Sequence, residues 1–295
     1  MRVAVIDVGS NTARLLVATV GVRGVVPVHE ERALLALGDE IERFGCISDL
    51  KLAETGERVR RYARRVRALG CTSLIVIVTA PGRQSANAEA LIRVLAGAAG
   101  VPVSVLSAAE EGRLAYDGAI SQARDLPRTV AVCDVGGGST EIVLGQPSLG
   151  PTFCCSLDIG SLRLTRRLLD DDPPGRKAIA RARSAVARSL DVVGTPSVEK
   201  ALITGGTARS LRRLGGGRLL DADALRNAVE SASCKTSAGL SREYGLDPFR
   251  ARTILAGTLI LAEVQSRLDI PLEVARGGLR EGAALALLAR SDAAA

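Results

Sequence analysis

The order of apolar and polar residues predicts strands that alternate with helices along most of the chain. Apolar runs typical of buried strands lie at 74–78, 101–106, 152–157 and 199–203. Helical spacing of apolar residues is found over 51–69, 85–97, 107–122, 160–169, 175–193, 222–238, 248–267 and 279–290. Strands that alternate with helices predict an α/β fold with two sheets and crossover helices.

An internal repeat is the most informative feature of this pattern. Residues 3–17 (VAVIDVGSNTARLLV) and 130–144 (VAVCDVGGGSTEIVL) align on Asp7 and Asp134. Each copy predicts a β-hairpin with a tight turn of small residues, where glycine permits close approach of another backbone. We therefore expect two similar domains, 1–126 and 127–295, with the helix at about 279–292 able to pack back on the first.

Composition limits the class of protein. The chain has 295 residues, of which 47% are hydrophobic and only 2% aromatic, so the cores must be aliphatic. No apolar run is long enough to span a membrane. The N-terminus begins directly with strand-like residues and has no signal-peptide pattern. We expect a cytoplasmic protein that does not bind membranes.

Charge and rare residues narrow the chemistry. One histidine excludes a multi-histidine metal centre, and the six cysteines form no C-x-x-C pair, so a zinc site is not expected. A net charge of +7 indicates anionic partners. The scarcity of aromatics argues against nucleic acid bound by base stacking. Carboxylates, backbone amides, arginine and a divalent cation must therefore supply the chemistry.

The second hairpin carries the sharpest motif, DVGGGSTE at 134–141. Three consecutive glycines expose backbone N–H groups that can cradle phosphate oxygens, and two hydroxyls add donors. Asp134 and Glu141 are carboxylates suited to a hard cation such as Mg²⁺. The alternative is a glycine-rich turn without a ligand. The predicted phosphate-binding residues here are Gly136, Gly137, Gly138, Ser139 and Thr140.

The first hairpin offers a matching set. Asp7 is expected to hold a metal or water, while Ser10, Asn11 and Thr12 lie in the turn as phosphate donors. The alternative is an Asx-type turn without a ligand.

Two further segments are candidates. Gly205, Gly206 and Thr207 follow a strand and open a helix, where anions bind readily. Glu110 and Glu111 lie early in the helix that Ser107 is expected to cap, with Glu110 at the capping-box position. A carboxylate there could deprotonate an attacking water, but on the residues alone an exposed acidic helix start is the better interpretation.

Arginines near the ends of motifs could bind phosphate bidentately. The candidates are Arg83, Arg163 and Arg280.

In this order the motifs resemble the exopolyphosphatase / guanosine pentaphosphate phosphohydrolase family over nearly the whole chain. They are DVGSNT at 7–12, TAPGRQSAN at 79–87, EGRL at 111–114, DVGGGSTE at 134–141, SLDIGSLRLT at 156–165, GGT at 205–207 and GLREG at 278–282. Many members have Arg-Asp where Arg83-Gln84 stands here, and Glu where Arg166 stands. The chain resembles the short two-domain members, which lack additional helical domains for long polyphosphate.

The resemblance implies an actin-like ATPase (ribonuclease H-like) superfold with the active site in the interdomain cleft. It implies Mg²⁺-dependent release of the terminal phosphate from polyphosphate or guanosine pentaphosphate, and a homodimer. It makes Glu111 the catalytic base, reversing the interpretation from the residues alone. It also makes Asp134 and Glu141 the metal-associated carboxylates and Arg83 a phosphate contact.

Two other functions stay open from the sequence. One is an actin-like ATPase or sugar kinase with a nucleotide at Gly205–Thr207. The other is a non-catalytic binder of polyphosphate or guanosine tetraphosphate that regulates a partner.

Overall fold

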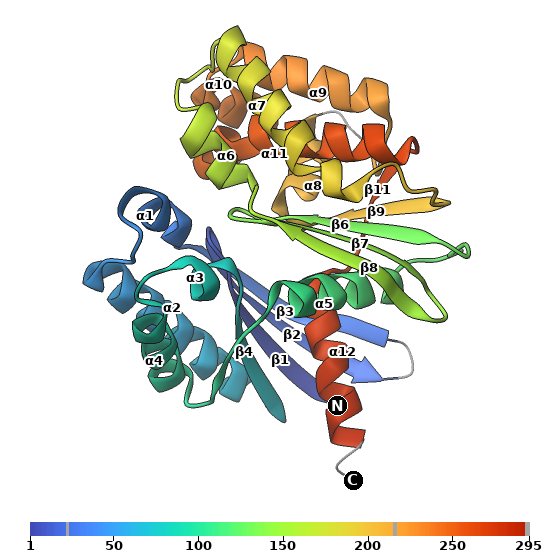
Figure 1. Cartoon of the computed structure of the whole chain (residues 1–295). Coiled ribbons are helices and arrows are strands. Elements are labelled where there is room, and N and C mark those ends of the chain that lie inside the picture. The colour runs from blue at the N-terminus through green and yellow to red at the C-terminus, as the bar shows by residue number, and fades with distance from the viewer. Residues whose placement is uncertain (22–23, 215–216, 293–295) are drawn as a thin grey trace. The chain divides into compact units, whose positions relative to one another are not determined.

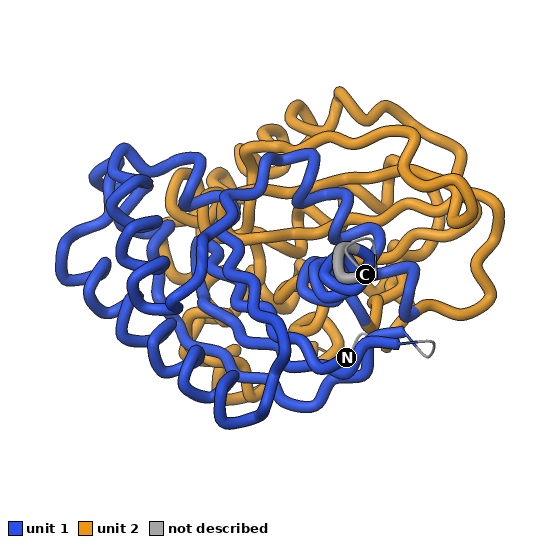
Figure 2. The backbone as a smooth tube through the Cα atoms, turned by 90° about the horizontal axis from the view of Figure 1, so that it is seen from below, with its two compact units in different colours: residues 1–122, 277–295 blue, residues 123–276 orange. Residues whose placement is uncertain are grey.

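The computed structural model describes residues 1–21, 24–214 and 217–292 (Figure 1). The chain forms two compact units, drawn in different colours in Figure 2. Unit 1 comprises residues 1–122 and the C-terminal segment from 277 onward, and unit 2 comprises residues 123–276. None of the helices in the described ranges combines the length and the apolar character that a membrane span requires.

Unit 1 is built on a mixed sheet. Its strands are β1 (Arg2–Val8), β2 (Thr12–Gly21), β3 (Gly24–Leu34), β4 (Ser73–Val78) and β5 (Val103–Val105). Its helices are α1 (Leu37–Phe44), α2 (Asp49–Ala68), α3 (Ala80–Gln84), α4 (Ala88–Ala99), α5 (Ala108–Ser121) and α12 (Leu279–Asp292). The strand order is β3-β2-β1-β4-β5, in which β1 is antiparallel to β2 and parallel to β4.

Alternation along β1 supplies the cores on both faces of this sheet. Ile6 belongs to the cluster that α2 and α4 complete with residues such as Val59 and Leu91. Val5 belongs to the opposite cluster, which α12 completes with residues such as Ala283. Successive strand residues point to opposite faces, so a continuous apolar strand must be covered by helices on both sides.

Unit 2 repeats this plan. Its strands are β6 (Val130–Val135), β7 (Thr140–Gln146), β8 (Gly150–Leu157), β9 (Lys200–Thr204), β10 (Leu219–Leu220) and β11 (Leu272–Val274). Its helices are α6 (Ser161–Leu168), α7 (Arg176–Ser189), α8 (Gly205–Leu211), α9 (Ala222–Cys234), α10 (Ser237–Tyr244) and α11 (Pro248–Leu268). The strand order is β10-β11-β9-β6-β7-β8. Without β10 it corresponds strand for strand to unit 1, which confirms the repeat.

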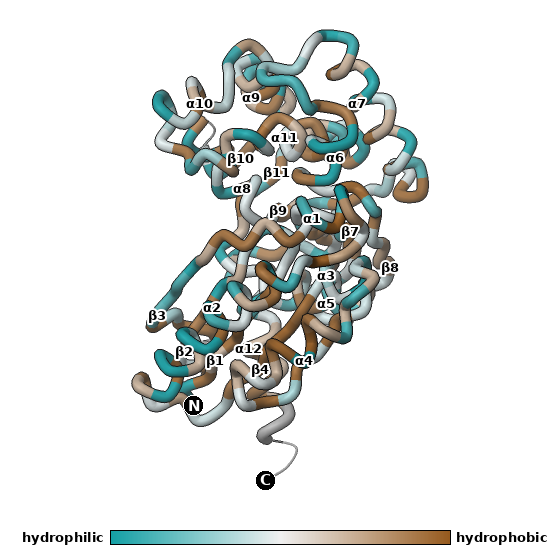
Figure 3. The backbone as a smooth tube through the Cα atoms, turned by 90° about the vertical axis from the view of Figure 1, so that its left-hand side faces the viewer, coloured by the Kyte–Doolittle hydropathy of each residue, from teal (hydrophilic) through white to brown (hydrophobic). Residues whose placement is uncertain are grey.

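Helix α11 is the centre of the unit 2 core. Its buried residues include Ile254, Leu255, Ile260 and Leu261, which lie on several sides of the helix. A helix that is apolar all round is one that other elements surround. The hydrophobic cluster around it includes residues of α6, α7, α9 and α10. Along α7, in contrast, hydrophobic and hydrophilic stretches alternate (Figure 3).

Two predicted helices differ from the structure, one in where it begins and one in being divided. The helix expected at 85–97 begins only at Ala88, because Asn87 uses its side chain to bind the backbone N–H and carbonyl of Ile47 at 2.9 and 2.7 Å. The helix expected at 222–238 ends at Cys234, and Thr236 caps a separate helix, α10. Side chains that bind backbone groups compete with helix continuation.

Candidate functional site

The turn between β1 and β2 is fixed by backbone hydrogen bonds. The Gly9 N–H donates to the Thr12 carbonyl at 3.0 Å and closes the turn. From the segment after β3, the N–H of Leu35 donates to the Asn11 carbonyl at 2.9 Å. The same segment binds the next residue of the turn, since the N–H of Gly38 donates to the Ser10 carbonyl at 2.7 Å. The carbonyls of this turn are therefore occupied from outside the hairpin.

The turn between β6 and β7 has the same construction. The Gly136 N–H donates to the Ser139 carbonyl at 3.0 Å, and the Ser161 N–H donates to the Gly136 carbonyl at 2.9 Å. In the part of the chain that the structure describes, the N–H groups of Gly137 and Gly138 donate no hydrogen bond. The turn thus offers backbone donors in the way that anion-binding turns do.

Close packing behind this turn depends on glycine. Gly160 is the N-cap of α6, and a Cβ there would lie 2.4 Å from the carbonyl oxygen of Gly137. Gly205 adopts φ +88°, and a Cβ there would lie 2.6 Å from Oδ1 of Asp134. Both positions therefore exclude a side chain, which explains why the motifs SLDIGSLRLT and GGT accompany the hairpin.

Oxygen donors gather at the end of β6. Asp134 lies opposite Glu141 of β7 in antiparallel register and opposite Thr204 of β9 in parallel register. Ser156 donates to Oε1 of Glu141 at 2.8 Å. The Thr204 hydroxyl is buried, and no described residue forms a hydrogen bond with it. An unsatisfied buried hydroxyl beside two carboxylates fits the oxygen-only ligand set of Mg²⁺.

A complete metal centre is not formed within either unit alone. No group of three or more His, Cys, Asp or Glu side chains is placed to hold a metal across residues 1–21, 24–214 and 217–292. In unit 1, Asp7 takes the position of Asp134, but its partner across the hairpin is Arg14 rather than a carboxylate. In the turn itself, Oδ1 of Asn11 is buried and has no hydrogen-bond partner among the described residues.

Helix α5 places two adjacent glutamates differently. The capping box forms as predicted, with the Glu110 N–H bound to Ser107 and the Glu110 carboxylate bound to the Ser107 N–H at 2.8 Å. Hydrogen bonds donated to this carboxylate by the Ser107 hydroxyl and by the Ser107 N–H lower the pKa of Glu110. Glu111 is instead only 7% exposed. The interpretation as an exposed acidic helix start thus holds for Glu110 and is wrong for Glu111.

Arg83 holds the Glu111 carboxylate in place. Its Nη1 lies 2.8 Å from Oε2 of Glu111 and also donates to the Leu106 carbonyl at 2.8 Å. Arg83 comes from α3, 28 positions earlier in the chain. The structure therefore joins two residues that sequence reasoning had singled out independently, and the guanidinium favours the ionised form of the carboxylate.

Other candidates lie in the interior. The Thr140 hydroxyl is fully buried and donates to the Ile159 carbonyl at 2.5 Å. Thr207 is also fully buried, and its hydroxyl accepts a hydrogen bond from Arg250 at 3.4 Å. These two hydroxyls stabilise the turns from behind, and their role as phosphate donors stays a prediction.

Two candidate arginines are held in ion pairs. Arg163 is paired with Asp158 at 3.0 Å, and Arg280 with Glu30 at 2.8 Å. Both lie beside their motifs, as predicted, but each guanidinium already has a carboxylate partner.

Sequence reasoning missed Arg250. Arg250 is 7% exposed, and its guanidinium packs so closely on Gly206 that a Cβ there would lie 2.2 Å from Nη2. The sequence did contain a signal, since Arg250 is a charged residue within a long apolar helix pattern. A charged residue is seldom buried without a partner. Thr204 was missed because a threonine at the end of a strand has no special spacing.

The sequence profile of the Ppx/GppA phosphatase family matches residues 16–291. Exopolyphosphatase 1 of Mycobacterium tuberculosis is 30% identical, with 96% of this chain and 87% of the relative covered. Exopolyphosphatase 2 of the same organism is also 30% identical, with 90% and 91% covered.

A solved structure agrees with the sequence matches. The crystal structure of the Aquifex aeolicus Ppx/GppA family member superposes with a TM-score of 0.85 at 26% identity and covers 99% of this chain and 98% of that one. The two mixed sheets thus have the actin-like ATPase fold, as predicted. The chain is homologous to exopolyphosphatases, which are phosphoanhydride hydrolases, and it belongs to the Ppx/GppA phosphatase family.

Proposed function

We propose that this protein is an exopolyphosphatase that releases the terminal phosphate of inorganic polyphosphate. The observation that carries the proposal is the buried Glu111 held by Arg83 in a chain that also has two hairpin turns of small residues closed in the same way. The resemblance to two-domain members favours short chains as substrate. A homodimer and a cytoplasmic location remain predictions from that resemblance.

The two turns would bind the terminal phosphates. The N–H groups of Gly137 and Gly138, with the hydroxyl of Ser139, would donate to phosphate oxygens from unit 2, and Ser10 and Asn11 from unit 1. The Arg83 guanidinium has five N–H donors. It can therefore keep Glu111 on one edge while it binds phosphate with another.

Glu111 would accept the proton of the attacking water. The water oxygen forms a bond to the terminal phosphorus, and its proton passes to the carboxylate. The bond from that phosphorus to the bridging oxygen breaks, and the electron pair leaves with the shortened chain. Orthophosphate is released, and Glu111 returns its proton to solvent.

Asp134, Glu141 and Asp7 are the residues that would hold a divalent cation, with Thr204 adding a neutral oxygen in unit 2. When bound, the cation would neutralise charge on the phosphate oxygens. Glu141 is oriented by Ser156 and is 1% exposed, so it is fixed before any ligand binds.

The test compares two neighbouring substitutions. Glu111→Gln keeps the shape of the side chain but removes the proton acceptor, so we expect phosphate release from tripolyphosphate to fall by about 10²–10⁴-fold. Glu110→Gln is the matched control, because its side chain caps the helix and glutamine also serves at that position. Near wild-type turnover by Glu111→Gln would show that another group is the base.

The same assay addresses the alternatives. Guanosine pentaphosphate is the second candidate substrate, since the family includes enzymes that act on it, and its hydrolysis is measured beside tripolyphosphate and long polyphosphate. Binding of polyphosphate or guanosine tetraphosphate without turnover at any divalent metal would favour a regulator. Tight ATP binding with no activity on polyphosphate would favour an ATPase or kinase.

A further inference from the structure

Helix α7 of unit 2 carries positive charge that the fold does not use. Within its 14 residues it has five basic side chains and no acidic one. All five are exposed, and none forms an ion pair or hydrogen bond with a described residue. They are Arg176, Lys177, Arg181, Arg183 and Arg188.

Three of these residues form a stripe on one side of the helix. Lys177, Arg181 and Arg188 are separated by four and seven positions, a spacing that places them on a common face. Over these positions the helix rises about 16 Å. On the opposite side, Ala182 and Val186 are buried in the unit 2 core, so the stripe faces away from it.

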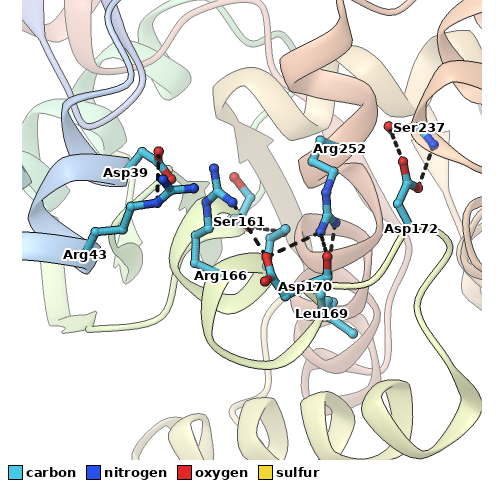
Figure 4. A network of polar contacts seen from close by, with 10 residues as sticks. Asp39, Arg43, Ser161, Arg166, Leu169, Asp170, Asp172, Ser237 and Arg252 are labelled. Atoms are coloured by element: carbon cyan, nitrogen blue, oxygen red, sulfur yellow. Dashed lines mark hydrogen bonds and ion pairs between the residues drawn. The ribbon is translucent and has the colours of Figure 1, made fainter.

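Three of the nearby acidic residues are bound to other partners. Asp170 pairs with Arg166 at 3.6 Å and with Arg252 at 3.7 Å, and Asp172 accepts from the Ser237 N–H at 2.8 Å (Figure 4). After the helix, Asp191 pairs with Arg267 at 2.9 Å. These three carboxylates are thus directed to α6, α10 and α11, and among the described residues no carboxylate, Asp171 included, forms an ion pair with the stripe.

This arrangement is unfavourable for the helix itself. Arg176 and Lys177 stand in the first turn, where the helix dipole disfavours positive charge. Lys177 and Arg181 are like charges four positions apart, which also destabilises a helix. Residues that break a local rule without a structural gain are expected at functional sites.

Helix α2 of unit 1 provides the contrast. It is also rich in arginine, but Arg60 pairs with Glu57, and Arg61 and Arg65 pair with Glu31. Its first turn holds an acidic residue, Asp49. Three of the six arginines of α2 are therefore paired with carboxylates, whereas none of the five basic side chains of α7 has such a partner among the described residues.

We propose that the α7 stripe (Lys177, Arg181 and Arg188) binds the distal part of a polyphosphate chain whose end occupies the phosphate turns. The proposal rests on the proposed function. Helix α6 starts with hydrogen bonds to the turn at Gly136 and Gly137, and α7 is the next helix along the chain. The stripe would thereby allow this two-domain chain to bind polymers longer than the short chains that the resemblance favours. It contains no aromatic side chain, which disfavours a single-stranded nucleic acid as the ligand.

The experiment replaces the three stripe residues together by glutamine and measures KM against salt concentration. Loss of three contacts with a flexible polyanion should reduce the slope of log affinity against log salt concentration by about 2. The loss of affinity between 50 and 200 mM salt should then be about 18-fold smaller than in the wild type. KM for tripolyphosphate should stay unchanged. The control replaces Arg58, Arg64 and Arg67 of α2, which removes the same charge and should leave the slope for long polyphosphate unchanged.

Each outcome is decisive. The proposal about the stripe is overturned if the α7 variant has an unchanged salt slope for long polyphosphate, or if the α2 control changes equally. Turnover of tripolyphosphate by the wild type would still uphold the proposed function in that case. If the wild type has no turnover, the proposed function fails, and the same slopes measured by equilibrium binding still test the stripe. A reduced slope for single-stranded RNA alone would identify a different polymer and overturn the proposal.

Discussion

Helices α5 and α12 of unit 1 contact each other through backbone atoms. A substitution that separates these helices is the sharpest test of how Glu111 is positioned. A Cβ on Gly118 of α5 would lie 1.9 Å from the Gly278 carbonyl oxygen and 2.6 Å from the Gly282 nitrogen. A Cβ on Gly282 would lie 1.9 Å from the Leu114 carbonyl oxygen. Since Cβ contacts below 3.0 Å are essentially never found, Gly118→Ala must separate the two helices by about 1 Å or more.

The expected loss of stability follows from two opposing effects. Overpacking in a tight interior costs about 1–3 kcal/mol. Alanine in a helix gains up to about 1 kcal/mol over glycine. The control Gly97→Ala isolates the second effect, because Gly97 is an exposed residue of α4 with no atom within 4 Å of its Cβ position. Gly118→Ala should therefore unfold at lower urea concentration than wild type, and Gly97→Ala at higher.

The same change should reduce activity beyond its effect on stability. Glu111 lies two turns before Gly118 on α5, and its carboxylate meets Arg83 of α3 at 2.8 Å. Displacement of a reacting group by about 1 Å can cost about 10²-fold in rate. We expect kcat on tripolyphosphate to fall while urea melts show that the enzyme is folded at the assay temperature. Equal urea midpoints for the two variants, or full activity in Gly118→Ala, would refute the reasoning.

Two further predictions concern titratable groups. Burial raises the pKa of Cys155 to about 11, so only about 0.01–0.1% of it is thiolate at pH 7–8, and burial also raises the pKa of Cys133. A thiol reagent should therefore modify exposed Cys234 first and Cys133 only on unfolding, and fast labelling of Cys133 in the native protein would contradict the structure. Ser107→Ala should destabilise the protein by about 1 kcal/mol at pH 7. Hydrogen bonds from Ser107 lower the pKa of Glu110. Their contribution to the free energy of unfolding is therefore complete above about pH 4.5 and is lost as the pH falls through the lowered pKa. The urea midpoints of variant and wild type should accordingly converge in acid.

The fold could be predicted largely because its strands are apolar on both faces. The run at 74–78 became β4, and the two hairpins formed in register about their turns. Strand β3 was missed because charged and apolar residues mix along it, as expected for a strand at the edge of a sheet. Strand β11 has only three residues, Leu272–Val274, and so gives no periodic signal.

The candidate site was less accessible to sequence reasoning, because its decisive facts are contacts over long sequence separations. The pairs Arg83–Glu111 and Arg250–Thr207 are 28 and 43 positions apart, so no local spacing reveals them. The motif that contains Thr140 suggested that the Thr140 hydroxyl lies in a loop and donates to a phosphate. In the structure Thr140 is the first residue of β7 and its side chain points inward, an orientation that depends on where the turn ends.

The duplication accounts for how one hairpin could acquire two roles. In both copies the turn is closed by the same glycine N–H bond, Gly9 to Thr12 and Gly136 to Ser139, each at 3.0 Å. The charged positions take no part in that closure, so they could diverge without loss of the turn. Opposite the strand aspartate, unit 1 has Arg14 where unit 2 has Glu141. Two facing carboxylates attract a cation, whereas an arginine in the same place repels one. We therefore expect Asp134 and Glu141 of unit 2 to contribute more to binding the cation than Asp7, which has Arg14 opposite it, while unit 1, which carries Arg83 and Glu111, would supply the base.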